Sequence, residues 1–186
     1  MILRNVHLRM PSIKTKTTYL EMRSPPVSRI EPPCEGIEIV WAKSPSTVDY
    51  LAWYKAVGEA WLWTDRFQMA PASLQALLDD PGVAVHLLLV DQQPAGFAEI
   101  DGRNSDDVEI KYFGLFPAFI GRGLGKYFLN AIVHQVWQHR PQRLWLHTCD
   151  LDHTTALPNY LKAGFKIFDE KLVDKVVPKS LFGSRT

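Results

Sequence analysis

The sequence has few cysteines, no excess of either charge and no long apolar run. Its two cysteines, Cys34 and Cys149, are too few and too far apart for a disulfide scaffold or a Cys-x-x-Cys site, so we expect a reduced, cytoplasmic protein. The 21 Lys and Arg residues nearly balance the 20 Asp and Glu residues, which argues against a nucleic-acid partner. No stretch approaches the ~20 apolar residues of a membrane span, which argues against a membrane partner.

What is present is sufficient for one folded domain. The chain has 186 residues, of which 46% are hydrophobic and 22% charged, a composition typical of a globular core. Residues 1–30 hold six basic side chains and one acidic side chain, but no apolar run of ~7–15 residues follows, so we expect no secretory signal. We predict a Pro-rich basic arm over residues 1–36, partly extended and packed on the domain, and a single domain over residues 37–186.

The hydrophobic pattern changes period along the chain. Helices are predicted from Ser46, with Val48, Leu51 and Val57 on the apolar face, and over Pro71–Leu78, Lys126–His139 and Thr154–Ala163. Strands are predicted over Thr17–Arg23, which we expect at an edge of the sheet, Ile37–Lys43, Val83–Val90, Ala95–Ile100, Val108–Phe116, Arg143–Thr148, Phe165–Phe168 and Leu172–Val177. A run of strands followed by one strand–helix–strand crossover predicts an α/β fold with a mixed sheet and helices on its faces.

The most informative stretch is Gly121-Arg122-Gly123-Leu124-Gly125-Lys126, between a predicted strand and the strongest predicted helix. Glycines let backbone N–H groups approach a ligand, and a helix N-terminus adds unpaired donors and positive potential. Arg122 and Lys126 add positive charge where phosphates would lie. Together these features predict a phosphate cradle. A tight turn without a ligand is the alternative on local grounds.

The spacing excludes two common phosphate sites. A P-loop requires Gly at position 120 and Ser or Thr at position 127, where this chain has Ile120 and Tyr127. A dinucleotide-binding loop requires Gly-x-Gly-x-x-Gly early in a parallel unit, whereas these glycines alternate and follow a hairpin.

Two segments together resemble a known family. The first segment comprises Val108–Pro117, Ile120–Lys126 and the predicted helix after them, and it closely resembles the acetyl-CoA-binding core of the GNAT superfamily of N-acetyltransferases. The second segment is Ala156–Phe165, in which Tyr160 stands four residues before Gly164-Phe165, and it looks like the second signature of that superfamily. The matched motifs cover residues 108–168, and the element order matches from about Ile37 onward. Ile120 stands where the family has Gln or Arg, and His153 stands in place of the usual Asn.

The resemblance implies a fold and a cofactor site. The fold would be a central, mostly antiparallel sheet that is splayed at the cofactor site, with helices on both faces. Acetyl-CoA would be the acyl-donor cosubstrate, and no metal would be needed. The residues implied in its binding are Phe113, Gly114, Leu115, Phe116, Ile120, Gly121, Arg122, Gly123, Leu124, Gly125, Lys126, His153 and Tyr160.

Acetyl transfer to an amine requires proton transfers. An alkylammonium must lose a proton before attack, and the resemblance implies Glu109 as the general base, acting directly or through water, with Glu99 as the second candidate. It also implies Tyr160 as the general acid for the leaving thiolate. An ordinary solvated strand acid is the structural alternative for Glu109, and a packed core aromatic is the alternative for Tyr160.

The acceptor is expected beside the segment Glu59–Arg66. By resemblance this region flanks the substrate pocket, so Trp61 and Trp63 could form an aromatic wall while Glu59, Asp65 or Glu99 attracts an ammonium. Core aromatics with solvated acids are the alternative. The sequence thus predicts an N-acetyltransferase for a small-molecule amine, acting by direct transfer in a ternary complex, with a homodimer left open.

Two rival functions use other features. A non-catalytic acyl-CoA-binding sensor or interaction module could keep the same fold and cradle. His147 and Cys149, with His153 nearby, could form a metal site or a Cys–His nucleophile pair, but no paired Cys/His set supplies the remaining ligands. Alternate residues at a strand end are more simply one face of a sheet, so we expect no metal site.

Overall fold

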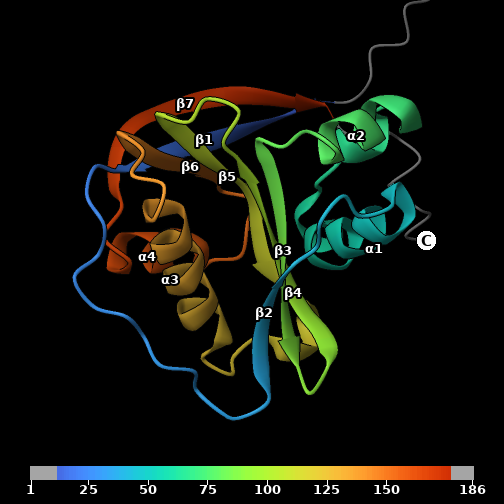
Figure 1. Ribbon diagram of the computed structural model, residues 1–186. Coiled ribbons are helices and arrows are strands. Elements are labelled where there is room, and N and C mark those ends of the chain that lie inside the picture. Colours follow the sequence, from blue (N-terminus) through green and yellow to red (C-terminus); the bar gives the residue numbers. More distant parts are fainter. Residues whose placement is uncertain (1–11, 177–186) are drawn as a thin grey trace, which may run out of the picture.

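The computed structural model describes residues 12–176 of the chain, and within that range it contains one seven-stranded sheet flanked by helices (Figure 1). The strands are β1 (Ser12–Met22), β2 (Ile37–Trp41), β3 (Val83–Val90), β4 (Gln93–Asp101), β5 (Asp107–Leu115), β6 (Arg143–Cys149) and β7 (Lys166–Val176). The helices are α1 (Thr47–Gly58), α2 (Pro71–Leu78), α3 (Leu124–Trp137) and α4 (Ala156–Lys162), with 3₁₀ turns η1 (Glu59–Trp61), η2 (Asp65–Gln68) and η3 (Pro117–Phe119). None of the helices in the described range is long and apolar enough to span a bilayer.

The sheet is mixed, as the sequence predicted. Its strand order is β2-β3-β4-β5-β6-β1-β7, and only β5 and β6 are parallel. Helices α1 and α2 lie on one side of the sheet and α3 and α4 on the other (Figure 1). Each side has its own apolar cluster, built around Tyr50, Tyr54 and Leu74 on the α1/α2 side and around Phe128, Ile132 and Leu146 on the α3 side. The two clusters confirm a sheet covered on both faces.

Local signals set the helix starts. The hydroxyl of Ser46 accepts a hydrogen bond from the N–H of Asp49 at 3.1 Å and caps α1, as a serine before a helix does. The face of α1 that packs on the sheet is formed by Tyr50, Tyr54 and Val57, while Val48 is 76% exposed. The predicted apolar face was therefore right for Val57 and for Leu51, which is partly buried against the same cluster, and wrong for Val48.

The prediction that β1 lies at an edge of the sheet was wrong. It begins at Ser12 and lies between β6 and β7, pairing antiparallel with both. Strand β7 is continuous, where two strands were predicted, because Asp169, Glu170 and Lys171 pair with Tyr19, Thr18 and Thr17 of β1. Charges within β7 face solvent and form ion pairs there, such as Lys16–Glu170 at 2.9 Å. The predicted strand residue 177 lies outside the described residues.

Strands β5 and β6 separate before either one ends. Their parallel pairing runs from Asp107↔Arg143 to Ile110↔Leu146, yet β5 continues to Leu115 and β6 continues to Cys149. In β5, a register shift between Glu99↔Tyr112 and Ile100↔Ile110 leaves Lys111 as an extra residue against β4, a bulge that increases local twist. The sheet is therefore splayed between β5 and β6.

Candidate functional site

A pocket of about 430 Å³ lies at the splayed end of β5. Its walls come from the end of α1, from η1, from the end of β5, from the start of α3 and from the segment leading into α4. It therefore joins elements from both sides of the sheet. The lining residues are Val57, Trp61, Trp63, Phe113, Gly114, Leu115, Ile120, Gly121, Gly123, Gly125, Lys126, Leu129, Asp152, His153, Thr155, Ala156, Asn159 and Tyr160.

The glycine loop at the start of α3 is open to a ligand. Gly121 and Gly123 have φ values of +83° and +77°, and Gly123 is the N-cap of α3 without any side-chain capping bond. A Cβ atom at Gly121 would have no heavy atom within 4 Å, so its backbone faces free space. The first N–H groups of α3 point toward the same region, where a helix N-terminus favours an anion. This geometry fits the phosphates of a nucleotide-type ligand.

The end of β5 lines the pocket with Phe113, Gly114 and Leu115. Gly114 lines it, and a Cβ atom there would lie 2.3 Å from Cγ1 of Val57, so α1 can approach β5 this closely only because position 114 is glycine. The β6-facing edge of Phe113–Leu115 lies beyond the last β5–β6 residue pair. Backbone groups on this edge are therefore in position to bind an extended polar ligand.

Tyr160 projects from α4 into the pocket from the α3 side. Its ring packs against Phe113 and Phe165, with centroids 6.4 Å away in both cases. Burial raises the pKa of Tyr160 above its ordinary value, and the negative charge of Asp152 raises it further. The hydroxyl is therefore held in its protonated form, which is the form that can donate a proton.

Asp152 connects the end of β6 to Trp63 of the pocket. One carboxylate oxygen accepts hydrogen bonds from the Thr148 hydroxyl at 2.7 Å and from the Cys149 N–H at 2.9 Å. The other oxygen accepts a bond from Nε1 of Trp63 at 3.2 Å. Trp61 packs on the His153 ring with centroids 5.4 Å apart. These contacts hold the part of the pocket wall that Trp61 and Trp63 form.

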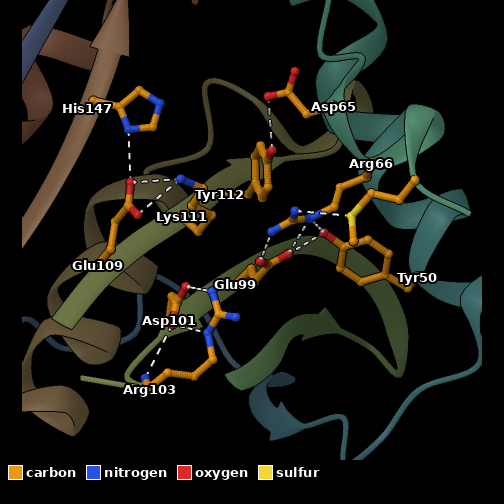
Figure 2. Close-up of polar contacts among 11 residues, drawn as sticks. Tyr50, Asp65, Arg66, Glu99, Asp101, Arg103, Glu109, Lys111, Tyr112 and His147 are labelled. Carbon is orange, nitrogen blue, oxygen red and sulfur yellow. Dashed lines mark hydrogen bonds and ion pairs between the residues drawn. The ribbon is translucent and has the colours of Figure 1, made fainter. Parts of the chain in front are cut away.

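Glu109 and His147 form a cross-strand pair at the point where β5 and β6 separate (Figure 2). Nδ1 of His147 lies 3.0 Å from Oε1 of Glu109, and Nζ of Lys111 donates to both carboxylate oxygens at 3.1 and 3.3 Å. The Glu109 side chain is 8% exposed and the His147 side chain 36% exposed. Neither residue lines the pocket itself.

Glu99 is held in a separate buried network. It pairs with the guanidinium of Arg66 and accepts a hydrogen bond from the Tyr50 hydroxyl. Figure 2 shows this network on the same face of the sheet as Tyr112, whose hydroxyl donates to Asp65 at 3.3 Å. The paired carboxylate holds the pKa of Arg66 above its ordinary value, against the effect of burial. Glu99 thus lies near the acceptor side but outside the pocket lining.

Comparison with known proteins identifies the family. The sequence profile of the acetyltransferase (GNAT) family matches residues 49–165. This chain belongs to the GNAT family. The family and the fold predicted from the sequence are therefore confirmed, and members of this family generally use acetyl-CoA. No curated protein sequence matches the chain.

Solved GNAT structures share the fold. A GCN5-related N-acetyltransferase from Sphaerobacter thermophilus has a TM-score of 0.64 at 17% identity, covering 86% of this chain and 50% of that one. A second one, from Kribbella flavida, has a TM-score of 0.58 at 17% identity, covering 88% and 58%. An aminoglycoside acetyltransferase from an uncultured soil metagenomic sample, in complex with trehalose, has a TM-score of 0.58 at 12% identity, covering 72% and 90%. This chain thus spans only half the length of the Sphaerobacter protein.

The structure brings most of the predicted GNAT site residues to one pocket. Three of the predicted cofactor contacts lie outside its lining: Phe116 packs against the α1/α2 cluster, Leu124 is buried in the α3 cluster, and the Arg122 guanidinium lies 5.1 Å from the Phe119 ring. The predicted residues that line the pocket are Trp61, Trp63, Phe113, Gly114, Leu115, Ile120, Gly121, Gly123, Gly125, Lys126, His153 and Tyr160. Two residues of the rival metal or thiol hypothesis have partners in the structure: His147 contacts Glu109, and His153 Nδ1 lies 2.8 Å from the Thr155 hydroxyl.

Sequence reasoning missed several residues of the pocket. Asp152 had a local signal, since an aspartate three residues past a strand end can bond the backbone of that strand, as it does here with Cys149. Val57 had none, because its place in the pocket depends on how closely α1 packs against Gly114. The other missed residues are Leu129, Thr155, Ala156 and Asn159.

Proposed function

We propose that this chain is an N-acetyltransferase that moves an acetyl group from acetyl-CoA to a primary amine of a small molecule, by direct attack in a ternary complex. One observation carries the proposal: a single pocket joins an open glycine loop at a helix N-terminus to a tryptophan-lined wall on the other side of the sheet. A donor and an acceptor can therefore meet at the gap between β5 and β6.

The donor side of the pocket fits a pantetheine-phosphate ligand. Acetyl-CoA, when bound, supplies an activated acetyl thioester. The backbone at Gly121, Gly123 and Gly125 would hold its pyrophosphate, with the Lys126 side chain adding positive charge. The free β5 edge at Phe113–Leu115 would bind the pantetheine amides and place an N–H near Leu115 at the acetyl oxygen.

Two side chains are proposed for the proton transfers. The amine nitrogen loses two protons in the reaction, one before attack and one that ends on the leaving sulfur. Glu109 is the base for the first proton; because its side chain is 8% exposed, it acts through an intervening group. Tyr160 is the acid for the second, since its raised pKa keeps the hydroxyl protonated.

The acceptor side is proposed to bind a cationic amine. Trp61 and Trp63 line the pocket, and the faces of aromatic rings attract ammonium groups. Asp65 is exposed beside Tyr112 and adds negative potential on this side, whereas the charge of the deeper Glu99 is compensated by Arg66. Because one structural neighbour is an aminoglycoside acetyltransferase, amino sugars belong among the acceptors to be tested.

Direct transfer is favoured over a covalent acetyl-enzyme. Burial and the nearby charge of Asp152 raise the pKa of the Cys149 thiol, so this cysteine is poorly ionised and a weak nucleophile. Cys34 and Cys149 are both free thiols, as is usual in the cytoplasm, where we place the protein.

Two assays test the proposed function. Acetyl-CoA should raise the melting temperature by mass action, and a thiol-release assay with spermidine, kanamycin, tyramine and a lysine peptide should show acetyl-dependent turnover with at least one amine. Stabilisation by acetyl-CoA without thiol release would support the non-catalytic sensor instead. No stabilisation by acetyl-CoA would contradict both functions.

A further inference from the structure

The pair formed by Glu109 and His147 contains a group that the proposed mechanism lacks. A base at Glu109 needs an intermediary to reach an amine, because the carboxylate is 8% exposed and both of its oxygens already accept bonds from Lys111. The ring of His147 is bonded to that carboxylate and is 36% exposed. The imidazole is therefore the accessible end of the pair.

The hydrogen bond sets which ring nitrogen is free. A carboxylate only accepts, so Nδ1 of His147 carries the hydrogen that is donated to Oε1 of Glu109 at 3.0 Å. In the neutral ring this leaves Nε2 as an unprotonated lone pair, the form that a general base requires. The ring is also held by its neighbours, with the Tyr19 ring at 5.8 Å and the Trp145 ring at 6.4 Å. Both the tautomer and the orientation of His147 are thus fixed before an acceptor binds.

The position of the pair connects it to the acceptor side of the pocket. Glu109 belongs to the paired part of β5, and His147 is the first residue of β6 beyond the last pair, Ile110↔Leu146. Figure 2 shows Glu109, Lys111 and Tyr112 along β5 between His147 and Asp65. Tyr112 contacts Trp63, a residue of the pocket wall, with ring centroids 5.1 Å apart. A row of side chains therefore leads from the pocket to His147.

We infer that His147 is the group that takes the proton from the acceptor amine, with Glu109 as its positioning residue. The inference rests on the proposed function and deepens it. Because His147 does not line the pocket, the ammonium nitrogen gives one proton through water to Nε2 of His147 and becomes a neutral amine with a free lone pair. The resulting imidazolium keeps its Nδ1–H on Glu109, whose negative charge stabilises it, and then releases the Nε2 proton to water. No proton or charge is left over in this cycle.

The charged and titratable groups around the imidazole are few. They lie on β5, on β1, on β7 and on β6 itself, and a pH profile assigned to His147 must consider each of them. They are Glu109, Lys111, Tyr19, Cys149, Lys171, whose ammonium lies 5.2 Å from the Tyr19 ring, and Asp169, which pairs with Tyr19 in the sheet and lies 2.9 Å from the Lys171 ammonium. Among these, imidazole is the side-chain type that ordinarily changes charge between pH 5 and 8.

The kinetic test compares His147→Gln with His139→Gln. Glutamine at position 147 can still donate to Glu109 but cannot accept and release a proton, whereas His139 is exposed just after α3 and lies outside the site. With the best amine of the panel above, kcat/KM of His147→Gln at pH 7 should fall about 100-fold, with acetyl-CoA stabilisation unchanged. The kcat/KM of this variant should also rise with pH in proportion to the fraction of free amine, whereas the kcat/KM of the wild type should reach a plateau. His139→Gln should match the wild type.

A spectroscopic test is independent of turnover. In protein labelled with ¹⁵N-histidine, NMR should show the neutral His147 ring protonated at Nδ1, and Glu109→Gln should weaken that preference. An Nε2-protonated ring in the wild type, or an active His147→Gln with the wild-type pH profile, would overturn the inference while the proposed function stands. If the wild type releases no thiol with any amine, the proposed function fails and the inference fails with it.

Discussion

Arg66 and Glu99 form an ion pair that is almost completely buried beneath the acceptor side of the pocket. The exposed fractions of their side chains are 10% and 1%. The Arg66 guanidinium also lies 5.0 Å from the Tyr112 ring, and its Nε donates to the Tyr50 hydroxyl at 3.2 Å. The pair thus links the short turn η2 to strand β4 and supports the face on which Tyr112 stands.

Breaking this pair should destabilise the fold. In Glu99→Gln the buried guanidinium loses its counter-charge, which should lower the free energy of unfolding by about 3 kcal/mol. Urea denaturation measures the change. The matched control is Glu59→Gln, because Glu59 meets Lys55 at 3.7 Å in an exposed pair, and it should change stability by less than about 0.5 kcal/mol. Equal effects of the two variants would contradict the structural role of Glu99.

Gly121→Ala tests the phosphate cradle. An alanine at φ +83° is strained, and its methyl group would enter the free space that the ligand phosphates need. We expect the Kd for acetyl-CoA, measured by titration calorimetry, to rise about tenfold, the equivalent of roughly 1.4 kcal/mol. The control Gly102→Ala adds a methyl group outside the pocket, where the nearest atom is 3.4 Å away, and should leave the Kd unchanged. An unchanged Kd in Gly121→Ala would argue against phosphate binding at this loop.

Tyr160→Phe tests the proposed acid. Phenylalanine keeps the packing against Phe113 and Phe165 but removes the hydroxyl, so kcat should fall about 100-fold while acetyl-CoA still binds. Because the pKa of Tyr160 is raised, its protonated form persists to higher pH than usual. The wild-type kcat should therefore show no decline from tyrosine ionisation up to about pH 10. Tyr127→Phe, outside the pocket, is the control, and a wild-type rate in Tyr160→Phe would exclude the hydroxyl as the acid.

His86 should make stability depend on pH. Burial lowers its pKa from 6.5 to about 4, so between these values the unfolded chain binds the proton and the folded chain does not. Stability from this group is complete above pH 6.5 and falls as the pH drops toward 4, by at most about 1.4 kcal/mol per pH unit. Urea denaturation at several pH values should show that the free energy of unfolding falls less steeply below pH 6.5 in His86→Gln than in the wild type. If the free energy of unfolding has the same pH dependence in the variant and the wild type, His86 does not titrate in this way.

The sequence predicted what depends on neighbouring residues. Helix α3 and the glycine loop before it are encoded locally, by apolar spacing at Phe128, Ile132 and Val136 and by the glycines themselves. The place of β1 between β6 and β7 could not be predicted, because partners such as Thr17↔Cys149 and Thr17↔Lys171 are remote in sequence. The contact between Glu109 and His147 depends in the same way on the parallel register of two strands. A contact between side chains on two paired strands, such as that of Glu109 with His147, can therefore be found only once the fold is known.

The central claim is tested most directly by incubating the protein with acetyl-CoA and each amine of the panel, and measuring released thiol and acetylated amine together. The account predicts that at least one amine gains an acetyl group on nitrogen with an equal amount of free thiol, and that Gly121→Ala and Tyr160→Phe reduce both products in step. Binding of acetyl-CoA without either product would contradict catalysis, and absence of binding would contradict the site.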